Sequence, residues 1–214
     1  MPNLVIYGAG GHASVVADVV RQRGEHAIAG FLADQAHSEQ RRVFCGAKVL
    51  GGGEQLATLR GQGITLVVVA VGDNAARLRL AEAVIAAGLE LATAVHPGAI
   101  VAPDVSIGRG AVVAAGTVIN PGSRLGANVI VNTGATVDHD NVIEDGAHVG
   151  PGVHLAGHVT VGRAAWLGIG AVVVQRVSIG AGSVIGAGAV VLHDIPADVV
   201  AYGVPARIVR AVSP

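Results

Sequence analysis

The residues best suited to acid–base chemistry in this chain are histidines, and several of them gather in one stretch. The 214 residues include nine histidines, and four of these fall close together: His139, His148, His154 and His158. His139 stands between Asp138 and Asp140. A carboxylate beside an imidazole fixes its tautomer and raises its basicity, as a general base requires. We therefore interpret His139 as a candidate general base with Asp140 as its partner; the alternative is a solvated surface histidine.

A second candidate site is a glycine-rich turn near the start of the chain. Gly8, Gly10 and Ala13 match the pattern G-x-G-x-x-G/A after the apolar run 4–7. Glycines at such a turn let the backbone approach a ligand closely, and a helix N-terminus attracts phosphate. Asp34 follows the next apolar run, at about the distance expected for an acid that binds a ribose. The turn predicts a site for a nucleotide-containing ligand, unless its glycines serve packing alone.

An aliphatic residue at every sixth position indicates the fold that carries the histidines. The series runs without a gap through sixteen hexads from Val101 to Val191, and a smaller inward residue comes four positions after each aliphatic. Neither a helix nor a simple strand predicts this spacing; it is the signature of a hexapeptide β-helix, here a left-handed parallel one. Gly, Asn or Asp follows the aliphatic directly in ten of the sixteen hexads. We expect these residues to take positive φ at the corners of a three-sided prism.

Three hexads make one coil, so residues 18 apart lie above one another in coils stacked about 4.8 Å apart. Gly157 then lies over His139 and leaves open space above it, and His158 lies over Asp140. No two histidines are 18 apart, so one chain cannot gather three imidazoles within about 2.1 Å of one ion. A zinc site of the β-helical carbonic anhydrase kind would need a subunit interface, and we expect no metal.

Residues 1–97 have a different pattern, in which strands alternate with helices. We expect strands at 4–7, 27–32 and 65–71, helices at 14–23 and 75–87, and a loop-rich segment at 35–53. This order is typical of a parallel α/β sheet. Such a Rossmann-like domain is small, which favours a mononucleotide or nucleotide sugar over NAD. His96, Pro97 and Gly98 form a turn, so we expect a nucleotide-sugar domain at 1–97 and a β-helix with an irregular C-terminal cap at 98–214.

Composition excludes several classes of protein. The formal net charge is −1, which gives no reason to expect a nucleic-acid partner. Cys45 is the only cysteine and lies outside the β-helix, so we expect neither an internal disulfide nor an acyl-cysteine intermediate. No signal-like N-terminus and no uninterrupted apolar run of about 18 residues is present. We expect a cytoplasmic protein with no membrane segment.

The chain resembles, over nearly its whole length, the bacterial hexapeptide acyltransferases that modify sugars. It is most similar to the group of sialic-acid O-acetyltransferases and nucleotide-amino-sugar N-acetyltransferases. The segments that carry the resemblance are YGAGGHA (7–13), Asp34, VGDN (71–74), HPGAIVAP (96–103), VNTGATVDHDNVIEDGAHVGPG (131–152) and YGVPAR (202–207).

The resemblance implies a homotrimer in which acetyl-CoA, the co-substrate, lies in the groove between neighbouring β-helices. It implies that His139 is the catalytic base and Asp140 its partner, where the family usually has glutamate; Glu144 and Asp145 remain alternative partners. The positions implied at acetyl-CoA are Asn132, His148, Gly157, Ile169 and Ala187. Those implied around the sugar nucleotide are Gly10, Gly11, His12, Asp34 and Gly72.

The main hypothesis is an N-acetyltransferase of surface glycan biosynthesis. The amine of a UDP- or GDP-linked 4-amino-4,6-dideoxy sugar would attack acetyl-CoA directly, with His139 taking the proton. One alternative is an O-acetyltransferase that acts on sialic acid or a polysaccharide hydroxyl and needs no nucleotide. The other is a scaffold without enzymatic activity, whose histidines are merely exposed.

Overall fold

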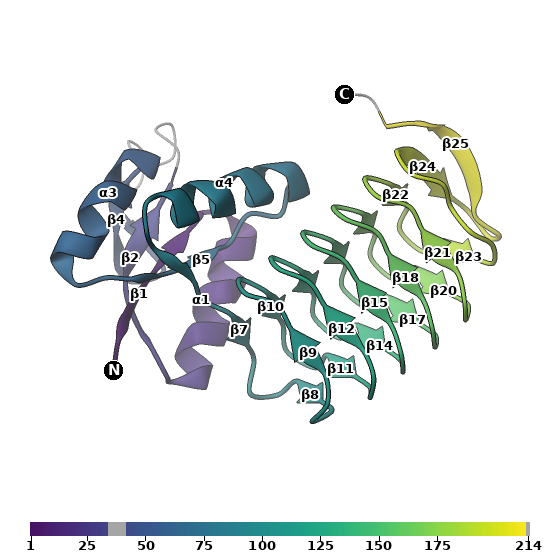
Figure 1. Ribbon diagram of the computed structural model, residues 1–214, viewed down its shortest axis with the longest axis horizontal. Helices are drawn as coiled ribbons and strands as arrows, with labels where there is room; N and C mark the ends of the chain where they lie inside the picture. The colour runs from purple at the N-terminus through teal and green to yellow at the C-terminus, as the bar shows by residue number, and fades with distance from the viewer. Residues whose placement is uncertain (34–41, 213–214) are drawn as a thin grey trace. The chain divides into compact units, whose positions relative to one another are not determined.

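The computed structural model describes residues 1–33 and 42–212. The chain forms two compact units, Met1–Pro97 and Gly98–Pro214. The first is an α/β unit and the second is a β-helix with a C-terminal hairpin (Figure 1). None of the helices in the described ranges is long and apolar enough to cross a membrane.

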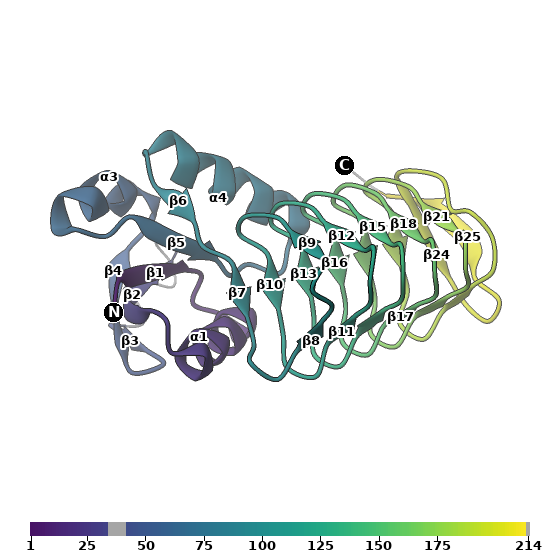
Figure 2. The same ribbon diagram turned by 60° about the horizontal axis from the view of Figure 1, so that its bottom comes forward.

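The α/β unit contains a six-stranded sheet in the order β3-β4-β2-β1-β5-β6, in which all pairings are parallel except that of β3 with β4. Helix α1 lies on one side of the sheet, and α3 and α4 lie on the other (Figure 2). The strands of this sheet are β1 Asn3–Tyr7, β2 Ala27–Leu32, β3 Val43–Phe44, β4 Ala47–Gly51, β5 Leu66–Val69 and β6 Glu90–Leu91, and the helices are α1 Gly11–Arg23, α3 Leu56–Leu59 and α4 Asn74–Ala86. Strand β7 Ala94–Val95 follows β6 and lies outside this sheet.

Strand β1 lies in the middle of this sheet and is buried on both faces. Leu4, Val5 and Ile6 are each almost fully buried, as expected for a parallel strand covered by helices on both sides. Val5 belongs to the core cluster that includes Leu56 and Leu59 of α3. The run of apolar residues at 4–7 therefore forms the central strand from which the glycine turn emerges.

The segment expected to be a loop contains a hairpin. Strands β3 and β4 pair antiparallel around Cys45 and Gly46, both of which have positive φ (45° and 76°). Two such residues make the kind of tight turn that joins antiparallel strands. The prediction of a loop at 35–53 was therefore wrong for its second half, and residues 34–41 lie outside the described residues.

The β-helix has three flat faces made of two-residue strands, and strands stack in parallel at a spacing of 18 residues, as the hexads predict. The first face contains β10 Val112–Val113, β13 Ile130–Val131, β16 His148–Val149, β19 Trp166–Leu167 and β22 Val184–Ile185. The second contains β8 Ile100–Val101, β11 Val118–Ile119, β14 Thr136–Val137, β17 His154–Leu155, β20 Val172–Val173 and β23 Val190–Val191. The third contains β9 Ser106–Ile107, β12 Arg124–Leu125, β15 Val142–Ile143, β18 Thr160–Val161 and β21 Ser178–Ile179.

We call the corner line between the first and second faces the first edge, that between the second and third faces the second edge, and that between the third and first faces the third edge. The interior follows the prediction, because both inward positions of the hexads are buried from Ala111 to Ala189. The C-terminal segment is more regular than expected: β24 Val199–Tyr202 continues the first face beside β22, and β25 Arg207–Ala211 pairs antiparallel with β24.

In the corners between residues 110 and 188, the positive-φ residue is not the one that the sequence indicated. It lies three residues after the aliphatic, as at Gly110, Gly116 and Gly134, and not directly after it. A Cβ on Gly108, which does follow the aliphatic directly, would lie 2.4 Å from the carbonyl carbon of Gly126 in the next coil. Glycine directly after the aliphatic thus allows coils to stack closely and is not needed for the turn itself.

Candidate active site

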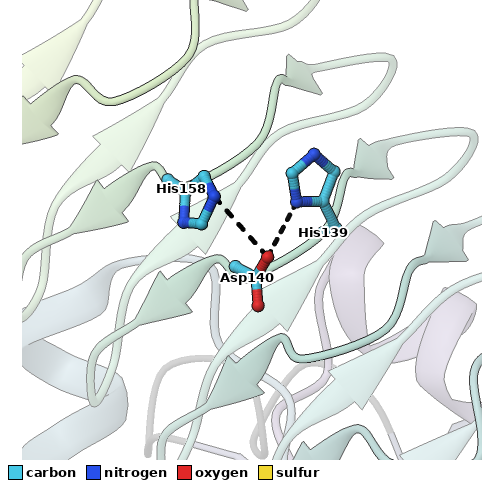
Figure 3. Close-up of side chains that lie close together, drawn as sticks. All are labelled: His139, Asp140 and His158. Atoms are coloured by element: carbon cyan, nitrogen blue, oxygen red, sulfur yellow. Dashed lines mark hydrogen bonds and ion pairs between the residues drawn. The ribbon is translucent and has the colours of Figure 1, made fainter.

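His139 and Asp140 form the corner that follows β14 on the second edge. Nδ1 of His139 lies 2.8 Å from Oδ2 of Asp140, and both side chains are about half exposed (51% and 50%). The same carboxylate oxygen lies 3.6 Å from Nε2 of His158, so that both rings face Asp140 (Figure 3). The hydrogen bond to His139 and the charge of His158 hold the pKa of Asp140 below its usual range. Asp140 is therefore an anion that fixes the Nδ1 side of His139 and leaves Nε2 for chemistry.

Gly157, 18 residues after His139, makes room for the histidine ring. A Cβ at position 157 would lie 2.5 Å from Nε2 of His139. The same corner position carries alanine at Ala115, Ala127 and Ala181. The absence of a side chain at 157 is therefore specific to the place where the imidazole lies.

The backbone N–H at this corner position is suited to an anion. In other corners it donates to a side-chain oxygen: Ala127 to Asp145 at 2.7 Å, Thr133 to Asn132 at 2.8 Å and Arg163 to Glu144 at 2.8 Å. Two of these acceptors are carboxylates. The N–H of Gly157 occupies the same position beside His139, where a developing oxyanion would be stabilised.

A buried asparagine forms hydrogen bonds to the backbone of this corner from the interior of the β-helix. Asn141 is fully buried at one of the inward positions. Its Nδ2 donates to the carbonyl oxygens of Asp138 (2.6 Å) and Ala156 (3.0 Å), and its Oδ1 accepts from the N–H of Val159 (3.0 Å). The side chain of Asp138 also accepts hydrogen bonds, from Asn120 and from the N–H of His139, which lower its pKa. These bonds fix the backbone on both sides of His139.

The two other acids considered as partners of His139 lie on the third edge. Glu144 accepts from the N–H of Arg163, and Asp145 lies 3.6 Å from the guanidinium of the same arginine. Both carboxylates are thus engaged in the corner that follows β15. Asp140 is the acid whose carboxylate contacts the imidazole ring of His139.

The structure does not bring all of the acetyl-CoA candidates to His139 within one chain. Asn132, Ile169 and Ala187 lie along the first edge, and Ile169 is 59% exposed. Nε2 of His148, on the first face, lies 3.2 Å from Nδ2 of Asn132. Gly157 alone among these candidates shares the second edge with His139. One full face of the prism, which carries His154 bonded to Thr136 (2.8 Å), separates the two groups.

One group of potential metal ligands is found among the described residues. Ligand atoms of His139, Asp140 and His158 lie within 4.8 Å of one another. Two imidazoles and a carboxylate, and not three imidazoles, are therefore gathered in one chain. In this arrangement the carboxylate already binds Nδ1 of His139.

The glycine turn lines a cavity of about 600 Å³ in the α/β unit, at the carboxyl ends of β1 and β5. This is the point where the connections leave the sheet in opposite directions, and such a switch point is where α/β sheets bind ligands. Of the sugar-nucleotide candidates, Gly10, Gly11, His12 and Gly72 line the cavity, while Asp34 lies outside the described residues. Arg79, which the sequence did not single out, also lines it.

The wall of the cavity includes the open N-terminus of helix α1 and the tight turn at Gly8. A Cβ at Gly10 or Gly11 would meet nothing within 4 Å, whereas one at Gly8 (φ 141°) would lie 2.4 Å from the carbonyl oxygen of Ala70. Helix α1 begins at Gly11 and has no acidic residue in its first turn, so its dipole favours an anion. Gly8 thus makes the tight turn, and Gly10 and Gly11 leave room for a ligand.

The sequence also missed Arg77, which is fully buried behind the loop after β5. Its guanidinium donates to the carbonyl oxygens of Val71 (3.0 Å) and Gly72 (3.2 Å) and to Oδ1 of Asn74 (2.8 Å). Burial lowers the pKa of Arg77 to about 10, and burial together with the charge of Arg77 lowers the pKa of His12 to about 4. Asp73 caps α4 by accepting a hydrogen bond from the N–H of Ala76. The spacing of three between Asn74 and Arg77 on a helix was the available signal.

Comparisons with known proteins agree with both units. The PglD N-terminal domain family matches residues 3–84, and the bacterial transferase hexapeptide family (six repeats) matches residues 158–193. UDP-N-acetylbacillosamine N-acetyltransferase of Bacillus subtilis is 36% identical over 118 residues, which are 54% of this chain and 52% of that protein. The match thus spans about half the length of this curated relative.

Solved structures match over nearly the whole chain. A histidine-to-asparagine mutant of perosamine N-acetyltransferase from Caulobacter crescentus, in complex with CoA and GDP-perosamine, is 43% identical, with 96% of each chain covered and a TM-score of 0.92. The acetyltransferase domain of PglB from Neisseria gonorrhoeae, in complex with acetyl coenzyme A, is 36% identical, with 97% and 99% covered and a TM-score of 0.89. The chain therefore belongs to the hexapeptide-repeat family of nucleotide-amino-sugar acetyltransferases.

Proposed function

We propose that this enzyme transfers the acetyl group of acetyl-CoA to the amine of a 4-amino-4,6-dideoxy sugar linked to GDP or UDP, in the cytoplasm and as a step in surface glycan assembly. The observation that carries the proposal is the corner at which Asp140 holds Nδ1 of His139 while Nε2 lies beside the space left by Gly157. A relative of 43% identity binds CoA and GDP-perosamine. The cavity at the glycine turn supports a nucleotide-linked acceptor.

In the proposed reaction, His139 is the only side chain that takes up and then releases a proton. The amine attacks the thioester carbon, and Nε2 of His139 takes a proton from the amine as the C–N bond forms. The N–H of Gly157 stabilises the oxyanion of the tetrahedral intermediate. The C–S bond then breaks, and the proton returns from His139 to the thiolate of CoA. The products are an amide and a free thiol.

We further propose that the working enzyme is a homotrimer. His139 and Gly157 lie on the second edge, whereas Asn132, Ile169 and Ala187 lie on the first edge of the same chain. A groove formed by the second edge of one subunit and the first edge of its neighbour would contain both groups. Threefold repetition of this heterologous contact closes a ring.

The test is a thiol-release assay with purified protein, acetyl-CoA and a panel of GDP- and UDP-linked 4-amino sugars. We expect CoA release with one nucleotide-linked amine, and none with the analogue that has a hydroxyl in place of the amine. We expect His139→Ala to lower kcat by about 10²–10⁴-fold, the usual contribution of a positioned base. Release with free sialic acid and not with any nucleotide-linked amine would contradict the proposal and establish O-acetylation. Full activity of folded His139→Ala would remove His139 from its role.

A further inference from the structure

A second histidine lies against the catalytic pair and has no part in the proposed reaction steps. The His158 ring meets the His139 ring edge to face, with centroids 5.1 Å apart and planes at 89°. Its Nε2 lies 3.6 Å from Oδ2 of Asp140, the oxygen that binds Nδ1 of His139. That distance is too long for a hydrogen bond but short enough for a charge interaction. The N–H of His158 also donates to the carbonyl oxygen of His139 at 3.0 Å.

The backbone conformation at His158 is one that favours a residue without a side chain. His158 has a φ of 59°, in the left-handed region that favours glycine. Nine of the fourteen consecutive corners between residues 110 and 188 have glycine at this position, and the others carry Asn128, Asp140, His158, Ala164 and Arg176. Left-handed backbone is strained for a residue with a Cβ, because the Cβ lies too close to the following carbonyl oxygen. The chain therefore carries an imidazole where glycine would be the less strained residue.

We propose that His158 is a positioning residue for acetyl transfer. Its imidazole holds the Asp140 carboxylate between two rings, and its edge-to-face contact fixes the plane of His139 so that Nε2 faces the space at Gly157. His158 itself touches neither the amine nor the thioester. This inference rests on the proposed role of His139 as the base.

The first experiment compares His158→Gly with Ala164→Gly. Both changes put glycine at a left-handed corner, but Ala164 (φ 56°) lies on the third edge, away from the histidines. For His158→Gly we expect an unchanged or higher Tm, a kcat lowered about tenfold and KM values within about twofold of the wild type. Ala164→Gly should keep the wild-type kcat. His158→Asn should recover part of the loss, because Asn tolerates this backbone and presents an amide N–H toward Asp140.

The second experiment repeats His158→Gly in a His139→Asn background. If His158 acts through His139, the second change should leave the residual rate of the first unaltered. An unchanged kcat in folded His158→Gly, or the same tenfold loss in the His139→Asn background, would overturn the inference. A full kcat in His139→Asn alone would instead overturn the assignment of the base. The two failures are therefore distinguishable.

Discussion

Gly157 is the residue whose replacement most directly tests the geometry around His139. We expect Gly157→Ala to fold, since alanine occupies the equivalent corner at Ala115, Ala127 and Ala181. The new Cβ would lie 2.5 Å from Nε2 of His139, so the ring must turn away. Displacement of a reacting group by about 1 Å can cost about 10²-fold in rate. We expect a loss of that order in kcat, measured by thiol release, with an unchanged CD spectrum.

The converse change at another corner is the control for this variant. Ala181→Gly alters the same backbone position on the third edge and should leave kcat at the wild-type value. A Gly157→Ala enzyme with wild-type kcat would show that the space beside His139 has no role in the reaction.

His12 should make the stability of the protein depend on pH. Burial, with a further contribution from Arg77, lowers its pKa from 6.5 to about 4 in the folded state. Between these two values the unfolded chain binds a proton that the folded chain does not, so stability decreases as pH falls through this window. The full shift corresponds to about 3 kcal/mol.

The measurement is a pair of urea titrations, followed by CD, at pH 7.5 and pH 4.5. Between these conditions the wild type should lose about 2–3 kcal/mol more than His12→Gln, which cannot titrate. Equal losses in the two proteins would show that His12 is protonated in the folded state as readily as in the unfolded state.

Among the structural elements, the corner 138–141 depends on the side chain of Asn141. We expect Asn141→Ala to reduce the free energy of unfolding by about 1–3 kcal/mol, because buried backbone groups of Asp138, Ala156 and Val159 lose their partner. We also expect kcat to fall, because the backbone on either side of His139 is released. Urea titration and the thiol assay measure the two effects.

Ser183→Ala separates these two effects. Ser183 occupies an inward position and donates to the carbonyl oxygen of Pro196 at 2.6 Å, far along the chain from His139. Its loss should lower stability while kcat stays at the wild-type value. A loss of kcat in both variants would mean that general destabilisation, and not the corner, governs the rate.

The regular elements were predictable because their periods are set by simple geometry. Strand stacking at 18 residues and the placement of Gly157 over His139 and His158 over Asp140 followed from the hexads alone. The position of the positive-φ residue in each corner did not follow from the hexads. Glycine allows close stacking of coils at Gly108 and takes positive φ at Gly110, and the amino-acid type alone does not distinguish these two uses. The buried contacts of Arg77 depend on the path of the loop after β5, and a periodic sequence pattern does not predict the path of a loop.

For the molecule as a whole, the sequence assigned acetyl-CoA residues that a single chain does not collect at His139. We expect sedimentation to show a trimer. We also expect mixed trimers of His139→Ala and Ile169→Asp subunits to recover activity. In an equal mixture, about one quarter of the grooves would combine an intact second edge with an intact first edge.

Each variant alone should be impaired, His139→Ala in kcat and Ile169→Asp in the KM for acetyl-CoA. Recovery to about a quarter of the wild-type rate after unfolding and refolding the two together would support a shared groove. If mixed trimers form and no activity returns, the site does not span two subunits. The hexad spacing places residues on edges, whereas the edges that meet would be determined by the neighbouring subunit of the proposed trimer.

Because the β-helix repeats every eighteen residues, its length can change only by whole coils if the packing of its interior is to be kept. Loss or gain of one residue within a hexad would turn every later inward side chain out of register, whereas a whole coil can be added or removed with the faces intact. Each added coil would lengthen the groove by about 4.8 Å and leave its cross-section the same. The length of the β-helix therefore changes in whole coils, and in the proposed trimer the number of coils after His139 would determine how long an extended thioester carrier the groove can hold.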